Sequence, residues 1–435
     1  MERFALSRMK EWKENENRKP LIIRGARQVG KTWIMKTFGQ QYFEKTAYVN
    51  FDNNARMKQV FEGDLDIERL VLAISAETGV SIEAENTLII FDEIQEVPKA
   101  LTSLKYFHEN APQYAIVAAG SLLGVALHQG TAFPVGKVDF LDLYPLNFRE
   151  FLCAMGEKQF VSMLDSCDTQ MVTVFKTKYI ERLREYYFVG GMPEVVKDFS
   201  EKKDYNRVRV IQKNLINYYQ QDFSKHAEIK LVPRLNLVWN SIPMQLAKEN
   251  KKYIYGQVRE GSRAKDFELA IQWLLDCGLI HKVQRIQKPD LPLKAYIDFD
   301  AFKLFLVDIG LLIAMTDLDA KVIIEGNKIF TEFKGALTEQ YILQQLISDV
   351  GVIPYYYSTQ NSKGEIDFLV QGKTSVIPIE VKAEENLKAK SLKAFCEKYQ
   401  PSYAVRTSMS DYREQDWMTN IPLYAIEWIE NYVNQ

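Results

Sequence analysis

The sequence has few of the features that would place it in a membrane or an oxidising compartment. Its longest apolar segment, residues 304–315, is interrupted by Asp308 and falls short of the roughly 20 residues that span a bilayer. We expect a buried helix there instead. The N-terminal stretch has no apolar signal core. The 4 cysteines are far apart and form no CxxC pair, which predicts reduced thiols and a cytoplasmic protein with no membrane partner.

The chain also has little net charge and few histidines. A formal charge of −2 gives no overall field that would draw the protein onto nucleic acid, so any DNA contact must come from a local patch. The 4 histidines have no metal-ligand spacing. At 435 residues the chain is too long for a single hydrophobic core, and two or three domains are expected.

Short apolar runs alternate with helical patterns over residues 1–150. The runs are "KPLIIRG", "TAYVNFD", "TLIIFDE" and "YAIVAAGS". Such alternation is typical of a parallel sheet with helices on both faces. The following hundred residues are mostly helical, apart from a turn at "GGMPE" (190–194). The sequence therefore predicts an α/β domain followed by a helical region.

The strongest motif is "GARQVGKT", which fits GxxxxGK[ST] and lies between an apolar run and a helical pattern. The backbone N–H groups of such a loop point at phosphate oxygens, and the following helix adds its positive dipole end. A glycine-rich surface turn is the alternative. We expect Lys31 to reach the β- and γ-phosphates of ATP and Thr32 to bind Mg²⁺. The predicted nucleotide-contacting residues are Gly25, Ala26, Arg27, Gln28, Val29, Gly30, Lys31, Thr32 and Trp33.

Two acidic residues follow the apolar run in "TLIIFDEIQ". Because ligands bind at the carboxyl ends of parallel strands, Asp92 is expected to hold Mg²⁺ and Glu93 to orient and deprotonate the attacking water. Acidic pairs after strands are common, but this one comes sixty residues after the phosphate motif. Ser121, at the end of the next apolar run, is a candidate sensor of the γ-phosphate or a helix cap.

Four segments, "RGARQVGKT", "FDEIQEVP", "AAGS" and "LYPLNFREF", together resemble a family of bacterial and archaeal AAA-type ATPases. Members of that family pair an ATPase core with a C-terminal domain of unknown function. "YFVGGMPEVV" (187–196) is similar to the helical junction of the family. Many relatives carry Gly-Arg before the "YPL" stretch, whereas this chain has Gly136 and Lys137. A lysine lacks the planar fork of arginine, so the resemblance gives no arginine finger.

Residues 231–300 show the order helix, short link, helix and β-rich segment, which is typical of a winged helix-turn-helix. The resemblance to the family implies the same fold. The second helix carries Arg263 and Lys265 but also Asp266 and Glu268, a mixture that is poor for binding phosphates. DNA contact and protein contact therefore both stay open for this region.

Near the C-terminus, "GEIDFLVQGKTSVIPIEVK" places Asp367 in one apolar run and Glu380 and Lys382 in the next. If the two strands are neighbours, Asp367 and Glu380 can share a hard cation, with Glu339 of an upstream helix as a further ligand. Lys382 would then orient the attacking water. This order resembles the PD-(D/E)xK nuclease fold. Two ordinary strands with polar faces are the alternative, since a fold does not establish a reaction.

The combined prediction is an α/β protein with a P-loop NTPase core, a helical and winged-helix region, and a C-terminal nuclease-like domain. The expected function is an ATP-binding and ATP-hydrolysing switch that uses Mg²⁺ and acts on DNA. The alternative is a nucleotide-dependent regulatory or scaffold protein that binds a protein partner and cuts nothing; a homo-oligomer stays open. The predicted domains are 1–150 (ATPase core), 151–230 (helical junction), 231–325 (winged helix) and 326–435 (nuclease-like).

Overall fold

The computed structural model describes residues 2–120, 123–124, 133–248, 251–324, 331–359, 364–385 and 389–434, without the side chains of residues 331–332. The chain divides into two compact units. The N-terminal unit comprises Glu2–Tyr144 with Asp276–Gly278, and the C-terminal unit comprises Pro145–Leu275 with Leu279–Gln435.

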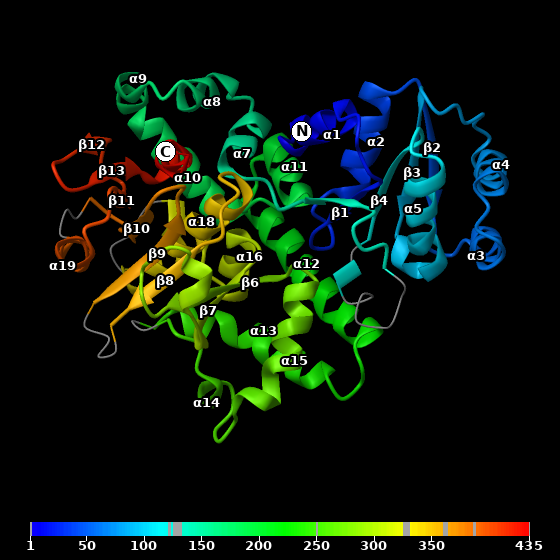
Figure 1. The fold of residues 1–435 in the computed structure, drawn as a ribbon. Coiled ribbons are helices and arrows are strands. Elements are labelled where there is room, and N and C mark those ends of the chain that lie inside the picture. Colours follow the sequence, from blue (N-terminus) through cyan, green and yellow to red (C-terminus); the bar gives the residue numbers. More distant parts are fainter. Residues whose placement is uncertain are drawn as a thin grey trace. The chain divides into compact units, whose positions relative to one another are not determined.

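The described residues of the N-terminal unit form a five-stranded sheet in the order β2-β3-β4-β1-β5 (Figure 1). All neighbouring strands are parallel, so their carboxyl ends share one edge of the sheet. This arrangement is the P-loop NTPase core expected from the sequence. The strands are β1 (Leu21–Arg24), β2 (Lys45–Asn50), β3 (Thr87–Asp92), β4 (Ala115–Ala119) and β5 (Asp139–Asp142).

Helices connect these strands, and two of them begin at side-chain caps. Asn54 accepts a hydrogen bond from the backbone N–H of Met57, and Asp66 accepts one from that of Arg69. Each cap satisfies a backbone donor that the first turn of a helix leaves unpaired. The helical elements of this unit are α1 (Ala5–Glu14), α2 (Lys31–Tyr42), α3 (Ala55–Glu62), α4 (Ile67–Thr78), η1 (Ile94–Glu96) and α5 (Pro98–Asn110).

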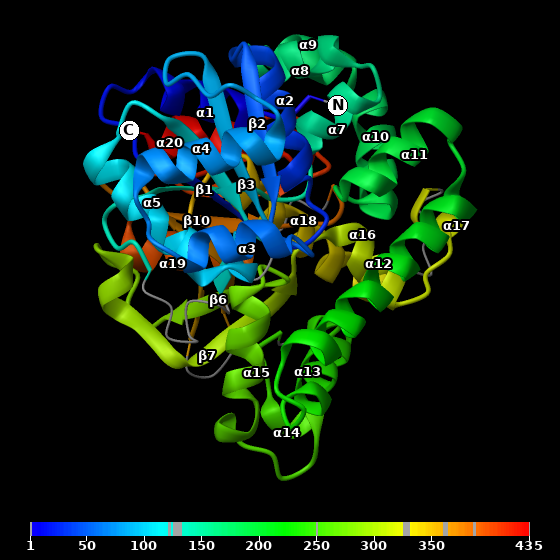
Figure 2. The ribbon, with the colours of Figure 1, turned by 90° about the vertical axis from the view of Figure 1, so that its right-hand side faces the viewer.

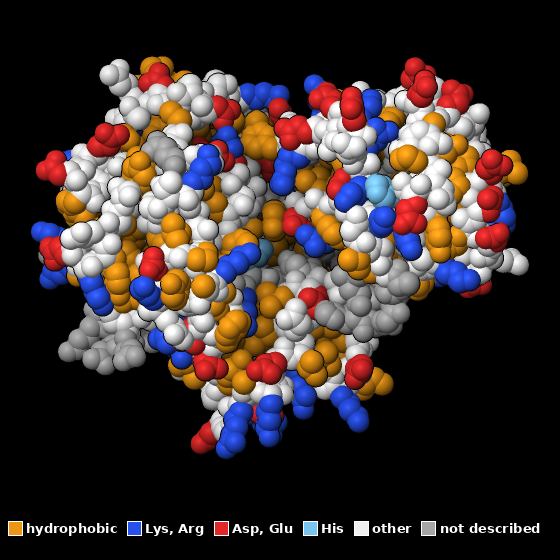
Figure 3. Space-filling view, viewed as in Figure 1, with side chains coloured by type: hydrophobic (Ala, Val, Ile, Leu, Met, Phe, Trp, Pro, Cys, Tyr) orange, Lys and Arg blue, Asp and Glu red, His pale blue; other side chains and the backbone are white. Residues whose placement is uncertain are grey.

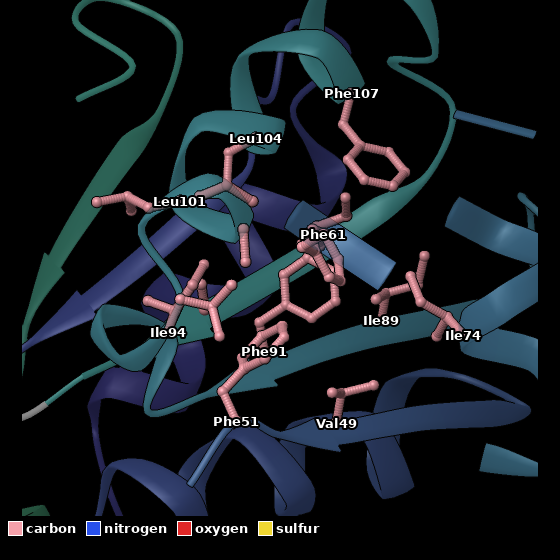
Figure 4. Close-up of a cluster of buried hydrophobic side chains, with 14 of the residues drawn as sticks. Val49, Phe51, Phe61, Ile74, Ile89, Phe91, Ile94, Leu101, Leu104 and Phe107 are labelled. Carbon is pink, nitrogen blue, oxygen red and sulfur yellow. The ribbon is translucent and has the colours of Figure 1, made fainter. Parts of the chain in front are cut away.

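Strands β3 and β4 are buried along their whole length, as expected for central strands with helices on both faces. On one face the rings of Phe51, Phe61 and Phe91 meet edge to face, with centroids 5.4–5.7 Å apart (Figure 4). Ile89 of β3 and Ile116 of β4 continue the same cluster. This packing fixes β3, and with it the two acidic residues that follow its apolar run.

The C-terminal unit begins with a long series of helices, as the sequence predicts. Helices α13, α14 and α15 lie together at the lower end of Figure 2. The helices up to the second sheet are α7 (Phe148–Ala154), α8 (Lys158–Asp165), α9 (Thr169–Val174), α10 (Lys176–Val189), α11 (Pro193–Lys202), α12 (Tyr205–His226), α13 (Val232–Leu246), α14 (Tyr255–Val258) and α15 (Ala264–Asp276).

The apolar segment 304–315 is not one buried helix. Its first residues end strand β7, and the rest forms the short helix α16 (Ile309–Met315). Asp308 separates the two because its carboxylate accepts hydrogen bonds from the backbone N–H groups of Leu311 (3.1 Å) and Gly191 (2.6 Å). The first of these bonds caps α16. In the described part of the chain, no helix is both long and apolar enough to cross a membrane.

A mixed sheet follows, with eight strands among the described residues in the order β12-β13-β11-β10-β9-β8-β6-β7. In the sequence, helix α18 (Thr331–Ser348) directly precedes β8, and α19 (Lys390–Tyr399) lies between β10 and β11. The strands are β6 (Ile280–Ile286), β7 (Ile297–Leu306), β8 (Tyr355–Ser358), β9 (Glu365–Gln371), β10 (Val376–Val381), β11 (Val405–Ser408), β12 (Arg413–Glu414) and β13 (Thr419–Pro422). Shorter elements are η2 (Leu293–Tyr296), α17 (Ala320–Ile324), η4 (Leu423–Ile429) and α20 (Glu430–Val433).

The β-rich segment of the expected winged helix, which contains β6 and β7, belongs to this large sheet. β6 pairs with β7 in a hairpin and also with β8, where Arg285 lies beside Tyr356. The boundary that the sequence predicts at residue 325 therefore does not separate two sheets. The helices before the hairpin do follow the expected order, so a winged helix remains a prediction for residues 231–325.

A group of charges, buried or partly buried except for Asp165 of α8, joins α7 and α8 to the end of α18 and to η4. The guanidinium of Arg149 binds both carboxylate oxygens of Asp349 and one oxygen of Asp165. Glu427 lies close to these charges and is buried. Burial, reinforced by the nearby carboxylate of Asp349, raises the pKa of Glu427 to about 8. Burial therefore favours the neutral form of the Glu427 side chain in the folded protein.

We expect Glu427→Gln to remove one cause of the loss of stability between the two pKa values of this group. The folded pKa of Glu427 lies above its ordinary value of 4.5, so its contribution to stability is complete below that pH and is lost as the pH rises through about 8. At about 1.4 kcal/mol per pH unit between the two pKa values, the loss amounts to a few kcal/mol. Urea unfolding from pH 5 to 9 should show a flatter pH dependence for the variant. Exposed Glu201→Gln is the control, and a slope equal to wild type in the Glu427 variant would contradict the assignment.

Candidate functional site

The loop between β1 and α2 depends on two glycines. Gly25 has φ +143°, and a Cβ atom there would lie 2.1 Å from the carbonyl oxygen of Leu143. Gly30, directly before α2, has φ +95°. Only glycine adopts these conformations without strain, and the absent side chain at Gly25 lets the loop pack against the backbone after β5. The loop therefore has the tight, side-chain-poor form that a phosphate cradle requires.

Lys31, the first residue of α2, is buried within this loop. Its ammonium donates hydrogen bonds to the carbonyl oxygens of Gly25 (2.9 Å) and Ala26 (2.8 Å). Burial lowers the pKa of Lys31 to about 8, although the carboxylates of Glu93 and Asp92 oppose that shift. An anion in the loop would favour the charged form. The lysine is thus held where a phosphate group would improve its electrostatic environment.

Asp92 is the point where three elements of the site meet. Its Oδ2 atom accepts a hydrogen bond from the hydroxyl of Thr32 on α2 (2.7 Å) and another from the hydroxyl of Tyr48 on β2 (2.9 Å). The parallel register places Asn50 of β2 beside Asp92, which brings Tyr48 into reach. Hydroxyl and carboxylate oxygens are the donors that Mg²⁺ prefers, so Thr32 and Asp92 fit a magnesium site.

Glu93 follows Asp92 with φ +51°, a left-handed conformation that is uncommon for residues other than glycine. Its backbone N–H donates to Oδ1 of Asp92 (3.1 Å), and its side chain accepts a hydrogen bond from Nε2 of Gln95 (2.7 Å). Gln95 also lies against Gly120 at the end of β4, where a Cβ atom would come within 2.0 Å of its Oε1. Gln95 therefore connects the acidic residue to the next strand of the sheet.

The remaining residues of the phosphate motif surround the same loop. Val29 is buried and anchors the loop in the unit, whereas Arg27 and Trp33 are exposed. Gln28 has φ +67°. Ser121, the candidate γ-phosphate sensor or cap, lies outside the described residues. All the described residues predicted to contact the nucleotide thus lie in one loop and the first turn of α2.

Lys137 is far from these residues within the N-terminal unit. It precedes β5, which runs parallel to β1, so it lies towards the amino edge of the sheet, whereas the phosphate loop leaves the carboxyl edge. Its ammonium forms an ion pair with Glu109 (3.0 Å). Lys137 therefore does not supply a positive charge to the loop of its own unit.

The C-terminal candidate residues have separate partners. Strands β9 and β10 are antiparallel neighbours, which is the condition that the predicted shared cation site sets. Asp367 accepts a hydrogen bond from the backbone N–H of Val381 (2.7 Å), and burial raises its pKa to about 7. Glu380 instead pairs with Lys382 (2.6 Å) and accepts from the backbone N–H of Leu392 on α19 (3.1 Å).

Within the part of the chain that is described, no group of three or more His, Cys, Asp or Glu residues is arranged to hold a metal ion. The predicted metal site of Glu339, Asp367 and Glu380 therefore gains no support from the structure. The catalytic roles of Asp367, Glu380 and Lys382 stay predictions.

The helix predicted to contact DNA presents both signs of charge. Arg263, Lys265 and Glu268 are exposed, and Asp266 accepts a hydrogen bond from the backbone N–H of Arg263 (2.8 Å). Lys, Arg, Asp and Glu side chains are interspersed at the lower end of the view in Figure 3. A cavity of about 340 Å³ beside this helix is lined by Arg234, Leu237, Arg259, Glu260, Gly261, Ser262, Asp266 and Phe267. The mixture agrees with the sequence and gives no continuous basic surface.

Sequence reasoning missed Tyr48 and Gln95. Tyr48 lies in an ordinary strand pattern, and only the register of β2 beside β3 brings its hydroxyl to Asp92. Gln95 follows the acidic pair directly, so its position was a usable signal, but its contacts with Glu93 and Gly120 depend on the turn after β3.

Comparison with known protein families gives three matches. Residues 17–152 match an AAA domain, residues 180–322 match a domain of unknown function (DUF8612), and residues 334–426 match a domain of unknown function (DUF4143). A comparison with curated proteins finds no match to the chain. The AAA match contains the phosphate loop, Asp92 and Glu93. The chain therefore carries an AAA-type ATPase domain with the P-loop fold.

Solved structures with partial similarity include a Walker-type ATPase of Pyrococcus abyssi, at 15% identity over 72% of this chain and 95% of that one, with a TM-score of 0.44. The Aeropyrum pernix ORC1 protein in complex with DNA is 14% identical over 72% and 91%, with a TM-score of 0.27. The RuvB Holliday junction branch migration motor of Thermotoga maritima is 12% identical over 64% and 87%, with a TM-score of 0.28.

We expect Gly25→Ala to weaken nucleotide binding roughly tenfold or more, because strain at positive φ and displacement of the loop cost about 1–3 kcal/mol. Gly79→Ala is the matched control, since Gly79 also has positive φ (+69°) but open space around its Cα. Titration with a fluorescent ATP analogue measures both affinities. Wild-type affinity in a folded Gly25→Ala protein would show that the loop does not bind the nucleotide.

Proposed function

We propose that the chain binds ATP with Mg²⁺ at the edge of the N-terminal sheet and hydrolyses it. The observation that carries the proposal is the hydrogen bond between Thr32 and Asp92, 2.7 Å long, directly beside the buried Lys31. It brings the motif at the start of α2 and the acidic end of β3 to one point. Phosphoryl transfer relies mainly on positioning and charge stabilisation, and these side chains supply both.

Each residue has a distinct part in binding. The backbone N–H groups of the loop and the first turn of α2 are the donors for the phosphate oxygens. Lys31 exchanges its hydrogen bonds to Gly25 and Ala26 for phosphate oxygens, whose negative charge stabilises its ammonium. Thr32 and Asp92 hold Mg²⁺, which when bound neutralises phosphate charge. Tyr48 keeps the Asp92 carboxylate oriented through its own hydrogen bond.

Glu93 acts as the general base. The attacking water gives one proton to the Glu93 carboxylate while its oxygen bonds to the γ-phosphorus; the bond between that phosphorus and the β–γ bridging oxygen breaks, and ADP leaves. Gln95 orients the base through its hydrogen bond to the carboxylate of Glu93. A change in this contact during hydrolysis would reach β4 through Gly120, against which Gln95 lies.

The chemical state of the nucleotide would then act as a switch for the C-terminal unit. A DNA-associated module is the first candidate for the output, in line with the predicted winged helix and nuclease-like fold. Regulation of a protein partner, without DNA cleavage, is the second. The mixed charges of α15 are poor for binding phosphates, so a DNA contact would have to come from another part of the unit.

Two variants separate binding from hydrolysis. Lys31→Ala should weaken ATP binding by roughly 10- to 100-fold, the loss expected for a charged hydrogen bond. Glu93→Gln should keep the affinity and lower the ATPase rate by about 100-fold or more, because it removes the base. Lys45→Ala is the matched control, since Lys45 is the first residue of β2 and lies at the amino ends of the parallel strands, opposite the phosphate loop. ATP affinity and the rate of phosphate release are measured for the wild type and the three variants.

If Lys31→Ala bound Mg-ATP as tightly as wild type, the assignment of the phosphate site would be wrong. Unchanged hydrolysis by Glu93→Gln would exclude Glu93 as the base. Repeating the phosphate-release assay with duplex, branched and single-stranded DNA addresses the output. A DNA-dependent rate supports the first candidate, and a rate independent of DNA, without DNA binding, favours a protein partner.

A further inference from the structure

A second cluster of buried charges lies in the C-terminal unit, around the predicted nuclease-like residues. At its centre is Lys303 of β7, whose side chain is 0% exposed. Its ammonium lies 2.5 Å from a carboxylate oxygen of Glu365 and 3.6 Å from Oε2 of Glu339. The ring of Tyr356 on β8 covers it, with the nitrogen 4.8 Å from the ring centroid. A buried ammonium is stable only with such partners.

A second lysine reaches the same carboxylate from a different part of the chain. Lys251 lies between α13 and α14, and its ammonium donates directly to Oε1 of Glu339. Both oxygens of Glu339 therefore face an ammonium group, one from Lys251 and one from Lys303. Asp367, on β9, belongs to the same electrostatic group, because Glu339, Lys303 and Lys251 all act on its carboxyl.

These contacts do not fit a divalent cation. Mg²⁺ requires several oxygen ligands at about 2.0–2.1 Å in near-octahedral geometry. Glu339 is already engaged by two positive charges, and a divalent ion at its oxygens would be repelled by both at short range in a buried setting. Glu380 has separate partners, Lys382 and the backbone of Leu392, so it does not complete a ligand set.

We infer that Lys251 and Lys303 take the place of a metal ion in the C-terminal unit, and that their ammonium groups exclude divalent cations from the Glu339–Asp367 carboxylates. The cluster is then a metal-free ion-pair network that joins β7, β9, α18 and the segment before α14. The inference is independent of ATP hydrolysis. It also means that a gain of metal binding should follow the removal of either positive charge.

The test measures Mn²⁺ binding by electron paramagnetic resonance in the full chain without nucleotide. All proteins carry Asp92→Asn, which removes the metal contribution of the phosphate site. The parent protein carries only Asp92→Asn. Any Mn²⁺ that it binds should be unaffected when Asp367→Asn is added. Lys251→Met and Lys303→Met keep an unbranched side chain, one atom shorter than lysine, and lose its charge, so each folded variant should acquire one bound Mn²⁺. Adding Asp367→Asn should abolish that binding.

Lys251→Arg is the matched control, because it retains the positive charge and should acquire no Mn²⁺ site. If Lys303→Met does not fold, Lys251→Met decides the question, since Lys251 is less buried than Lys303. Two results would overturn the inference. One is a parent protein whose Mn²⁺ binding is lost with Asp367→Asn. The other is a folded Lys→Met variant that binds no more Mn²⁺ than the parent.

Discussion

One hydrogen bond, from the hydroxyl of Thr32 to the carboxylate of Asp92, joins the two halves of the proposed nucleotide site. It exists because β1 and β3 are parallel and end at the same edge of the sheet, with β4 between them. The glycine-dependent loop places α2 so that Thr32, the second residue of the helix, faces that edge. The aromatic packing around Phe91 holds β3 in register. Changes that shift either strand would separate the residues to which we assign phosphate binding and hydrolysis.

The two units place buried charges in different settings. In the N-terminal unit, Asp92 is bound by two neutral hydroxyl groups, which leaves its negative charge available to a cation. In the C-terminal unit, the carboxylate of Glu339 is neutralised by two ammonium groups. Only the first arrangement retains the charge and the ligand type that magnesium requires.

The sequence predicted the N-terminal unit well because its signals are local. The phosphate-loop motif specifies a turn between a strand and a helix. The acidic pair marks the end of a buried strand. The sites that were missed depend on contacts between distant segments: Tyr48 reaches Asp92 through strand register, and Lys251 and Lys303 reach Glu339 through the tertiary fold. The apolar segment 304–315 was predicted as one helix because hydropathy does not reveal that Asp308 caps a helix beginning at Ile309. The pairing of β6 with β8 likewise has no local signal.

The most direct test of the central contact is the dependence of ATP affinity on Mg²⁺, measured by equilibrium titration of wild type and Asp92→Asn. If Thr32 and Asp92 together hold the metal beside the phosphates, Mg²⁺ should tighten ATP binding to wild type and have a much smaller effect on the variant. Binding without Mg²⁺ should be similar in the two proteins. An equal gain of affinity on adding Mg²⁺ to both would contradict the role of Asp92 as the metal-holding residue.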